Sequence, residues 1–460
     1  MWWPASLRIK SNDPEARLLA IQHLADEGGP RAFDALAEAI RDEDVRVCCA
    51  AVTALGNSDV NKATAVLVQA LTDQRPELRQ AIAETLPKTS GPEVIVALVG
   101  VLNDFDAGVR SRAARALEAL HWHPSSPKEE IWFAVAKGQF GQAAGFGAHA
   151  IEALEMVLLG NHSSLQAAAV NALGQIADER VLRALVRALK SSDHAVRMAA
   201  IEALAHFGGT KAAEALVPML RHPDHRVRVT AIDAVADLEG QPAVATLRQL
   251  LSDSIWDVRR AAAHALGKCK DAEAVDGLIG ALQDVDNDVR ESAIMALGDI
   301  GDKRAIGPLV LALVDADSSV RRAAGVTIQN LNPGWSTSEE AQQVVPELRA
   351  ALDSSDSAVR YAATRVLGRM NKLAEPGAGL KAPTTVVTAA GQKQRKVLAV
   401  FVELLQDPDR DVRLASVESL GRLGDPQAAA SLMTAMSDAD ETVRHAAAEA
   451  VESLNFLGAT

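Results

Sequence analysis

The sequence predicts an all-α protein, a right-handed α-solenoid of about thirteen stacked helix pairs. A leucine or an aliphatic equivalent returns every 31 residues through most of the chain, and another apolar residue precedes each one by eight positions. Aromatic residues make up only 3% of the chain, whereas small residues that favour close helix packing abound. A fixed period of about 20–50 residues is typical of a solenoid, in which each unit buries its apolar face against its neighbours. The repeating positions are Leu24, Leu55, Leu86, Leu117, Leu173, Leu204, Val235, Leu266, Leu297, Ile328, Leu367, Leu420 and Val451.

One repeat shows how a helix pair is specified. Residues 305–314 are apolar at helical spacing and are predicted to form the outer helix of the pair, helix A. Residues 315–319 then interrupt the pattern with side chains that prefer turns. Helix B follows, and Asp317 is placed to accept backbone N–H bonds as its N-cap. The predicted buried stripe of helix B is Val320, Ala323, Ala324, Thr327 and Ile328.

An Asp-x-x-x-Arg spacing lies at or near the start of helix B in ten of the thirteen repeats. We expect each arginine to bind an aspartate, either in the preceding turn or in the turn of the next repeat. The resulting ladder would fix the register of the repeats, and its role is structural, because repeated ion pairs shift pKa values without doing chemistry. The pairs assigned to this ladder are Asp193/Arg197, Asp224/Arg228, Asp286/Arg290 and Asp317/Arg321.

Units such as residues 286–302, which read DNDVRESAIMALGDIGD, resemble bacterial HEAT repeats of the short, phycobilisome-lyase-like type. The resemblance covers nearly the whole chain and implies an α-solenoid. It does not imply one function, since this family includes bilin lyases, scaffolds and adaptors.

The period breaks at three places. The step between repeating positions is 56 residues from Leu117 to Leu173, 39 from Ile328 to Leu367, and 53 from Leu367 to Leu420. These breaks predict four segments: N-terminal repeats at 1–120, an inserted helix and glycine-rich joint at 121–146, regular repeats at 147–332, and C-terminal repeats at 333–460 with an irregular loop at 373–392.

Tryptophan and phenylalanine residues mark two of these breaks. The insertion contains Trp132 and Phe133 in a short helix predicted for residues 128–137, and they are expected to pack the joint. The additional turn after residue 332 is expected to display Trp335 on a loop. All three residues are candidates for contacts made by the inserted segments.

Composition and motifs exclude several functions. A formal net charge of −13 disfavours nucleic-acid binding, which needs a basic surface. The N-terminus has no signal-peptide pattern, the apolar runs are too short to span a bilayer, and the three cysteines have no CxxC spacing, so we expect a cytoplasmic protein. No catalytic motif, metal-ligand set or cofactor fingerprint is found. The absence of any His-Glu dipeptide excludes an iron-binding hydroxylase of the HEAT-repeat type.

The residues one and four positions after the arginine of helix B vary, while the buried stripe is constant. We expect them to form an apolar strip beside arginines on the concave face, although burial by neighbouring helices is an equal alternative. The candidate partner-binding residues are Met198, Ile201, Val229, Ile232, Arg260, Ile294, Arg322 and Tyr361.

These observations predict a non-catalytic scaffold or adaptor that presents a long concave helical surface to one or more proteins. The resemblance implies an alternative, a bilin lyase or tetrapyrrole-handling chaperone, for which His121, His123, Trp132 and Phe133 would form the pocket wall. A structural subunit of a larger assembly is the second alternative. The sequence does not predict the oligomeric state.

Overall fold

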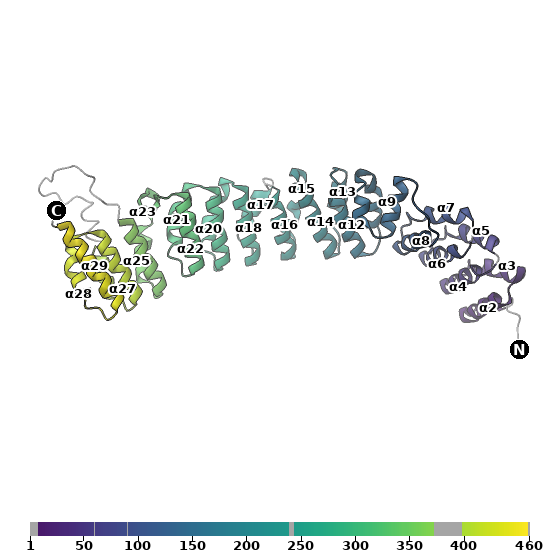
Figure 1. Cartoon of the computed structure of the whole chain (residues 1–460), viewed down its shortest axis with the longest axis horizontal. Coiled ribbons are helices and arrows are strands. Elements are labelled where there is room, and N and C mark those ends of the chain that lie inside the picture. Colours follow the sequence, from purple (N-terminus) through teal and green to yellow (C-terminus); the bar gives the residue numbers. More distant parts are fainter. Residues whose placement is uncertain (1–7, 59, 90, 239–242, 372–397, 459–460) are drawn as a thin grey trace. The chain divides into compact units, whose positions relative to one another are not determined.

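The computed structural model describes residues 8–58, 60–89, 91–238, 243–371 and 398–458, and all regular structure in these ranges is helical (Figure 1). The predicted all-α repeat architecture is confirmed. The chain divides into two compact units, Met1–Leu216 and Val217–Thr460.

In the first unit, two sets of helices alternate along the chain. The helices that carry the repeating leucine are α2 (Pro14–Glu27), α4 (Val45–Leu55), α6 (Pro76–Thr85) with the short helix η1 (Leu86–Lys88), α8 (Ala107–Ala119), α12 (Ser163–Gly174) and α14 (His194–Phe207). These are the predicted B helices. The A helices are α3 (Gly29–Ala39), α5 (Val60–Ala70), α7 (Pro92–Gly100), α11 (Ile151–Leu158), α13 (Val181–Ala188) and α15 (Gly209–Leu216).

The second unit continues the same alternation. Its B helices are α16 (His225–Asp237), α18 (Trp256–Cys269), α20 (Asn287–Ile300), α22 (Ser318–Leu331), α25 (Ser357–Asn371), α27 (Arg410–Leu423) and α29 (Glu441–Gly458). Its other helices are η3 (Val217–Arg221), α17 (Val244–Leu250), α19 (Val275–Ala281), α21 (Ile306–Ala312), α23 (Glu339–Gln343), α24 (Val345–Ala350) and α28 (Ala429–Ala435). Within two runs, α16 to α22 and α25 to α29, consecutive B helices pack against each other, as α18 does against α20 and α27 against α29.

The repeating aliphatic series forms the core. Twelve of its thirteen members are buried, and only Val451 near the end of the chain is half-buried. In the stripe predicted for α22, Val320, Ala324 and Ile328 are buried, with at most 1% exposure. Its other two members, Ala323 and Thr327, are half-buried. Burial of these aliphatic side chains contributes on the order of 1.5–3 kcal/mol each.

The first interruption builds a further short helix pair inside the first unit. The predicted inserted helix is α9 (Pro127–Ala136), which packs beside α8. The segment predicted to be a glycine-rich joint contains a second helix, α10 (Phe140–Ala144), which packs against α9 and α12. The division between the two compact units falls between residues 216 and 217. The loop predicted at 373–392 lies outside the described residues.

Candidate functional site

A ladder of arginines and aspartates connects consecutive repeats. In α20, Nε and Nη2 of Arg290 donate to the two carboxylate oxygens of Asp315, at 2.8 and 2.9 Å. Nη1 of the same guanidinium donates to the carbonyl oxygen of Asp284, at 2.8 Å. The carboxylate of Asp315 also accepts the backbone N–H of Asp317, so each rung fixes the turn at both of its ends. The pairs with this geometry are Arg17/Asp42, Arg79/Asp104, Arg259/Asp284, Arg290/Asp315, Arg360/Asp407 and Arg413/Asp438.

The two members of the Asp-x-x-x-Arg spacing have separate roles. Asp286 caps α20 by accepting from the backbone N–H groups of Asp288 and Val289, while Arg290 pairs with an aspartate of the next repeat. Asp193, Asp224 and Asp317 likewise cap α14, α16 and α22. Of the two partners considered from the sequence, the one in the next turn is therefore used, and Arg228 also follows it by bonding Asp253 at 2.9 Å.

Arg197 and Arg321 depart from this scheme. Each donates Nη1 to two carbonyl oxygens of its own turn. The aspartate of a regular rung lies six residues before the position of the next ladder arginine. The residue at that position is His222 before Arg228 and Ser354 before Arg360, so Arg197 and Arg321 have no aspartate there. The sequence shows these two substitutions directly, but the pairing rule that gives them meaning emerges only from the structure.

The predicted apolar strip is wrong for three of its members. Ile201, Ile232 and Ile294, four residues after the ladder arginine, have 0% exposure. In an α-helix a step of four residues from the inward-facing arginine returns to the packed side, where the flanking B helices cover it. These three isoleucines belong to the core.

The accessible side chains of the B helices lie one and five residues after the ladder arginine, and we name these positions the helix-B face. Arg322 is exposed, the Arg260 side chain is 41% exposed, and Met198, Val229 and Tyr361 are half-buried. The positions five residues after the arginine were missed in the sequence analysis. They are Glu202, Asp233, His264, Met295, Val326 and Arg365, all of which are exposed.

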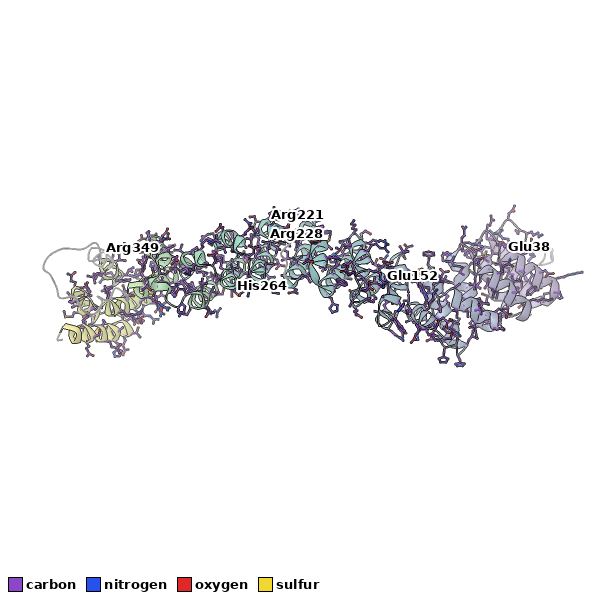
Figure 2. The ribbon with its side chains drawn as sticks, turned by 90° about the horizontal axis from the view of Figure 1, so that it is seen from above. Glu38, Glu152, Arg221, Arg228, His264 and Arg349 are labelled. Atoms are coloured by element: carbon purple, nitrogen blue, oxygen red, sulfur yellow. The ribbon has the colours of Figure 1, made fainter. Side chains whose placement is uncertain are left out.

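Apolar side chains appear on the helix-B face in the second unit. Met295 on α20 is 46% exposed and Val326 on α22 is 58% exposed, at positions that are polar in the other repeats. Trp256, at the start of α18, lies four residues before Arg260 on the same side of the helix and is 44% exposed, and we include it in the helix-B face. His264 of α18 belongs to the same face (Figure 2). In the sequence, Met295 and Val326 are recognisable because an apolar residue replaces a polar one at a fixed position of the repeat.

Guanidinium groups orient the aromatic rings of this region. The guanidinium of Arg260 lies 6.0 Å from the ring centre of Trp256 and also pairs with Asp257 at 2.7 Å. On α25, Arg365 lies 5.7 Å from the ring centre of Tyr361, and its Nη1 donates to the phenol oxygen at 3.0 Å. Such contacts hold both partners in one geometry at the surface.

The aromatic residues of the inserted segments are used for packing. The expectation that Trp335 is displayed on a loop is wrong, since its side chain is 2% exposed and the guanidinium of Arg369 covers its ring at 5.1 Å. Trp132 is 8% exposed, and Phe133 meets Trp122 edge-on with ring centres 5.5 Å apart. The residues proposed as a tetrapyrrole pocket wall therefore include two rings that are engaged inside the fold.

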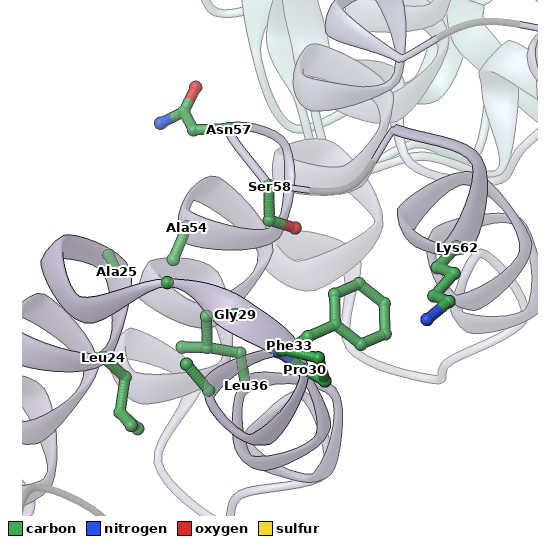
Figure 3. A pocket seen from close by; sticks show the side chains of 12 residues that line it. Leu24, Ala25, Gly29, Pro30, Phe33, Leu36, Ala54, Asn57, Ser58 and Lys62 are labelled. Atoms are coloured by element: carbon green, nitrogen blue, oxygen red, sulfur yellow. The ribbon is translucent and has the colours of Figure 1, made fainter.

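One cavity in the first unit lies among α2, α3, α4 and α5 (Figure 3). Its volume is about 200 Å³, and Leu24, Phe33 and Leu36 give it an apolar lining with Lys62 at its edge. Ligand pockets usually enclose roughly 300–1,000 Å³. The lining contains no paired acid and base, and the described part of the chain contains no group of three His, Cys, Asp or Glu residues arranged for a metal ion. Among the described helices, none is long and apolar enough to cross a bilayer.

Comparison with known proteins gives a family match. A family model described as HEAT repeats matches residues 5–86, 47–118, 151–236, 213–295, 244–329, 275–343 and 383–452. No curated protein sequence matches the chain.

Several solved structures are similar to the chain. Human deoxyhypusine hydroxylase has 23% identity and a TM-score of 0.26, over 64% of this chain and 94% of that one. Kap95p, in a structure with RanGDP, has 14% identity and a TM-score of 0.35, over 98% and 72%. A Kap121p mutant has 13% identity and a TM-score of 0.36, over 97% of this chain and 56% of that one.

Proposed function

The chain belongs to the family of HEAT repeat proteins, and from this premise we propose that it is a non-catalytic scaffold or adaptor whose helix-B face binds a protein partner. The observation that carries the proposal is the row Trp256, Met295 and Val326, which expose apolar side chains on consecutive B helices beside charged groups. Apolar side chains rimmed by charge are typical of protein contacts. The core positions stay aliphatic from repeat to repeat, whereas the residues of this face change. Such variation is expected of a surface that binds one partner specifically.

The rigidity of the repeats supports the proposal. In the second unit, ladder pairs hold consecutive turns and α16, α18, α20 and α22 pack in series, so this part of the face is held in one shape before a partner arrives. A preformed surface loses little conformational entropy on binding. The side chains of Cys48 and Cys269 are buried, which agrees with a reducing compartment such as the cytoplasm.

The test is purification of the tagged full chain from its own host, with co-purifying proteins identified by mass spectrometry and the absorbance of the eluate recorded. We expect a stoichiometric protein partner in a colourless eluate. A coloured eluate containing a tetrapyrrole-carrying protein would contradict the proposal in favour of a bilin lyase.

A pair of matched variants connects the partner to the face. Met295→Asp with Val326→Asp places charge on two exposed positions of the helix-B face and should abolish co-purification. Met433→Asp with Met436→Asp changes two methionines at α28 that are 54% and 42% exposed, and it should retain the partner. Equal loss or equal retention in both variants would overturn the assignment of the face.

A further inference from the structure

Two neighbouring helices of the second unit carry no acidic residue. Helix α22 reads SSVRRAAGVTIQNL and α25 reads SAVRYAATRVLGRMN, with five arginines between them in a chain of net charge −13. Arg321 and Arg360 are ladder residues that bond the turns. The other three, Arg322, Arg365 and Arg369, are exposed.

The helical spacing and one hydrogen bond join these three arginines into a single surface. Arg322 and Val326 lie four residues apart on α22, and Tyr361, Arg365 and Arg369 follow at intervals of four on α25, so each set lies on one side of its helix. Nη2 of Arg369 donates to Oε1 of Gln329 at 3.0 Å, which brings the two sets together. We name this surface the arginine patch, defined as Arg322, Val326, Gln329, Tyr361, Arg365 and Arg369.

No described carboxylate neutralises the arginines of this patch. The guanidinium of Arg322 has no hydrogen-bond or ion-pair partner among the described residues, and those of Arg365 and Arg369 bond only the neutral groups of Tyr361 and Gln329. Arginines of other B helices in this unit do have carboxylate partners, as Arg260 does with Asp257 and the exposed Arg410 with Asp411. The patch is therefore a local site of uncompensated positive charge.

The geometry of the patch also prepares it for binding. The ring of Tyr361 and the ring of Trp335 lie under Arg365 and Arg369, at 5.7 and 5.1 Å from the guanidinium carbons, so two of the three cations are held in place. Planar guanidinium groups bind carboxylates through paired hydrogen bonds. Val326, four residues after Arg322 on α22 and 58% exposed, adds an apolar side chain to the patch.

We propose that the arginine patch binds an acidic peptide segment that also carries apolar side chains, within a protein partner. This inference rests on the proposed scaffold function and names the chemistry of the partner. A protein segment fits better than a nucleic acid, because the rest of the chain is acidic and Val326 and Met295 offer apolar surface that a phosphate backbone does not use.

The experiment measures fluorescence anisotropy of labelled probes with the full chain. The acidic probe is the tripeptide Glu-Glu-Leu repeated four times, the neutral probe replaces each Glu by Gln, and the nucleic-acid probe is single-stranded oligothymidine. We expect the acidic probe to bind, the neutral probe not to bind, and added salt to weaken the complex.

Two triple variants locate the binding. Arg322→Ala, Arg365→Ala and Arg369→Ala together should weaken the acidic probe by about tenfold, the combined effect expected of three exposed ion pairs. The control replaces Arg41, Arg187 and Arg226 by alanine, which removes the same charge from exposed positions outside the patch, and it should bind like the wild type.

Other results overturn the inference. These are no binding of the acidic probe at low salt, equal weakening in both triple variants, or tighter binding of oligothymidine than of the acidic probe. Retention of a host partner by the patch variant would leave the scaffold function standing while showing that the patch does not bind that partner. Absence of any host partner for the wild type would contradict the scaffold function itself.

Discussion

At the scale of single residues, each ladder arginine forms hydrogen bonds to two consecutive turns. Arg290 satisfies the carbonyl oxygen of Asp284 in its own turn and both carboxylate oxygens of Asp315 in the next one. Both side chains are 14% exposed, so little water remains to replace a lost partner. Removal of one partner from such a pair costs more than the pair contributes, because the other charge is left without compensation.

Arg290→Ala should therefore lower the free energy of unfolding by about 2–3 kcal/mol, below the range for fully buried pairs because some water reaches this one. Arg304→Ala is the matched control, since that side chain is 49% exposed and its ion pairs contribute about 0–1 kcal/mol. Thermal melting, with hydrogen exchange of α20 and α22, measures both. Similar melting of the two variants would show that the ladder is not a stabilising element.

The ladder also predicts an acid dependence. Hydrogen bonds from Arg413 hold the pKa of Asp438 below its usual value, although burial acts in the opposite direction. A carboxyl whose folded pKa is depressed stabilises the fold above its unfolded pKa of about 4, and the contribution is lost as pH falls through the lower folded pKa. The contribution of this group should leave the melting temperature nearly constant between pH 7 and 5. When the pH is lowered further, below about 4, the melting temperature should decrease. Asp438→Asn should melt lower at pH 7 and show a weaker acid dependence, and an acid dependence identical to that of the wild type would exclude this role.

At the scale of helices, the repeats depend on close approach between consecutive B helices. A glycine follows the core leucine in several repeats, and a Cβ built on Gly267 of α18 would lie 2.8 Å from Cα of Ala296 on α20. Real side chains do not approach a backbone atom so closely, so the absent side chain sets the distance between the two helices.

Gly267→Ala should destabilise the second unit by about 1–3 kcal/mol, because the added methyl group forces the helices apart. Gly280→Ala is the control, since Gly280 lies near the end of α19, a Cβ added there would have no heavy atom within 4 Å, and alanine has the higher helix propensity. Denaturant unfolding checks both variants. A Gly267→Ala protein as stable as the wild type would show that the helices separate at no cost.

The sequence predicts the helices more completely than the site. Periodicity identifies the B helices and their core, because burial of a leucine such as Leu266 imposes the same demand in each repeat. Periodicity does not show how much of the surface of each B helix is covered by the neighbouring helices. Ile294 and Met295 are adjacent in the chain, yet the first has 0% exposure and the second 46%, a difference that depends on packing between repeats. The burial of Trp335 depends likewise on Arg369, which lies 34 residues later and covers its ring.

At the scale of the molecule, charge and apolar surface are unevenly distributed. The chain has a net charge of −13, yet α22 and α25 together carry five arginines and no acidic residue. Exposed apolar side chains on the same face lie at Trp256, Met295 and Val326. A surface with this composition discriminates between partners by charge and gains affinity from its apolar contacts.

The central claim is that the helix-B face binds a protein partner, and hydroxyl-radical footprinting of the purified complex tests it most directly. Methionine, tryptophan and tyrosine side chains report their own exposure, and both faces of the second unit carry them. Trp256, Met295 and Tyr361 report on the helix-B face, while Met433 and Met436 report on α28. The account predicts that partner binding protects the first three residues and leaves the two α28 methionines as reactive as in the free protein. Protection of Met433 and Met436, with Trp256, Met295 and Tyr361 unchanged, would contradict it.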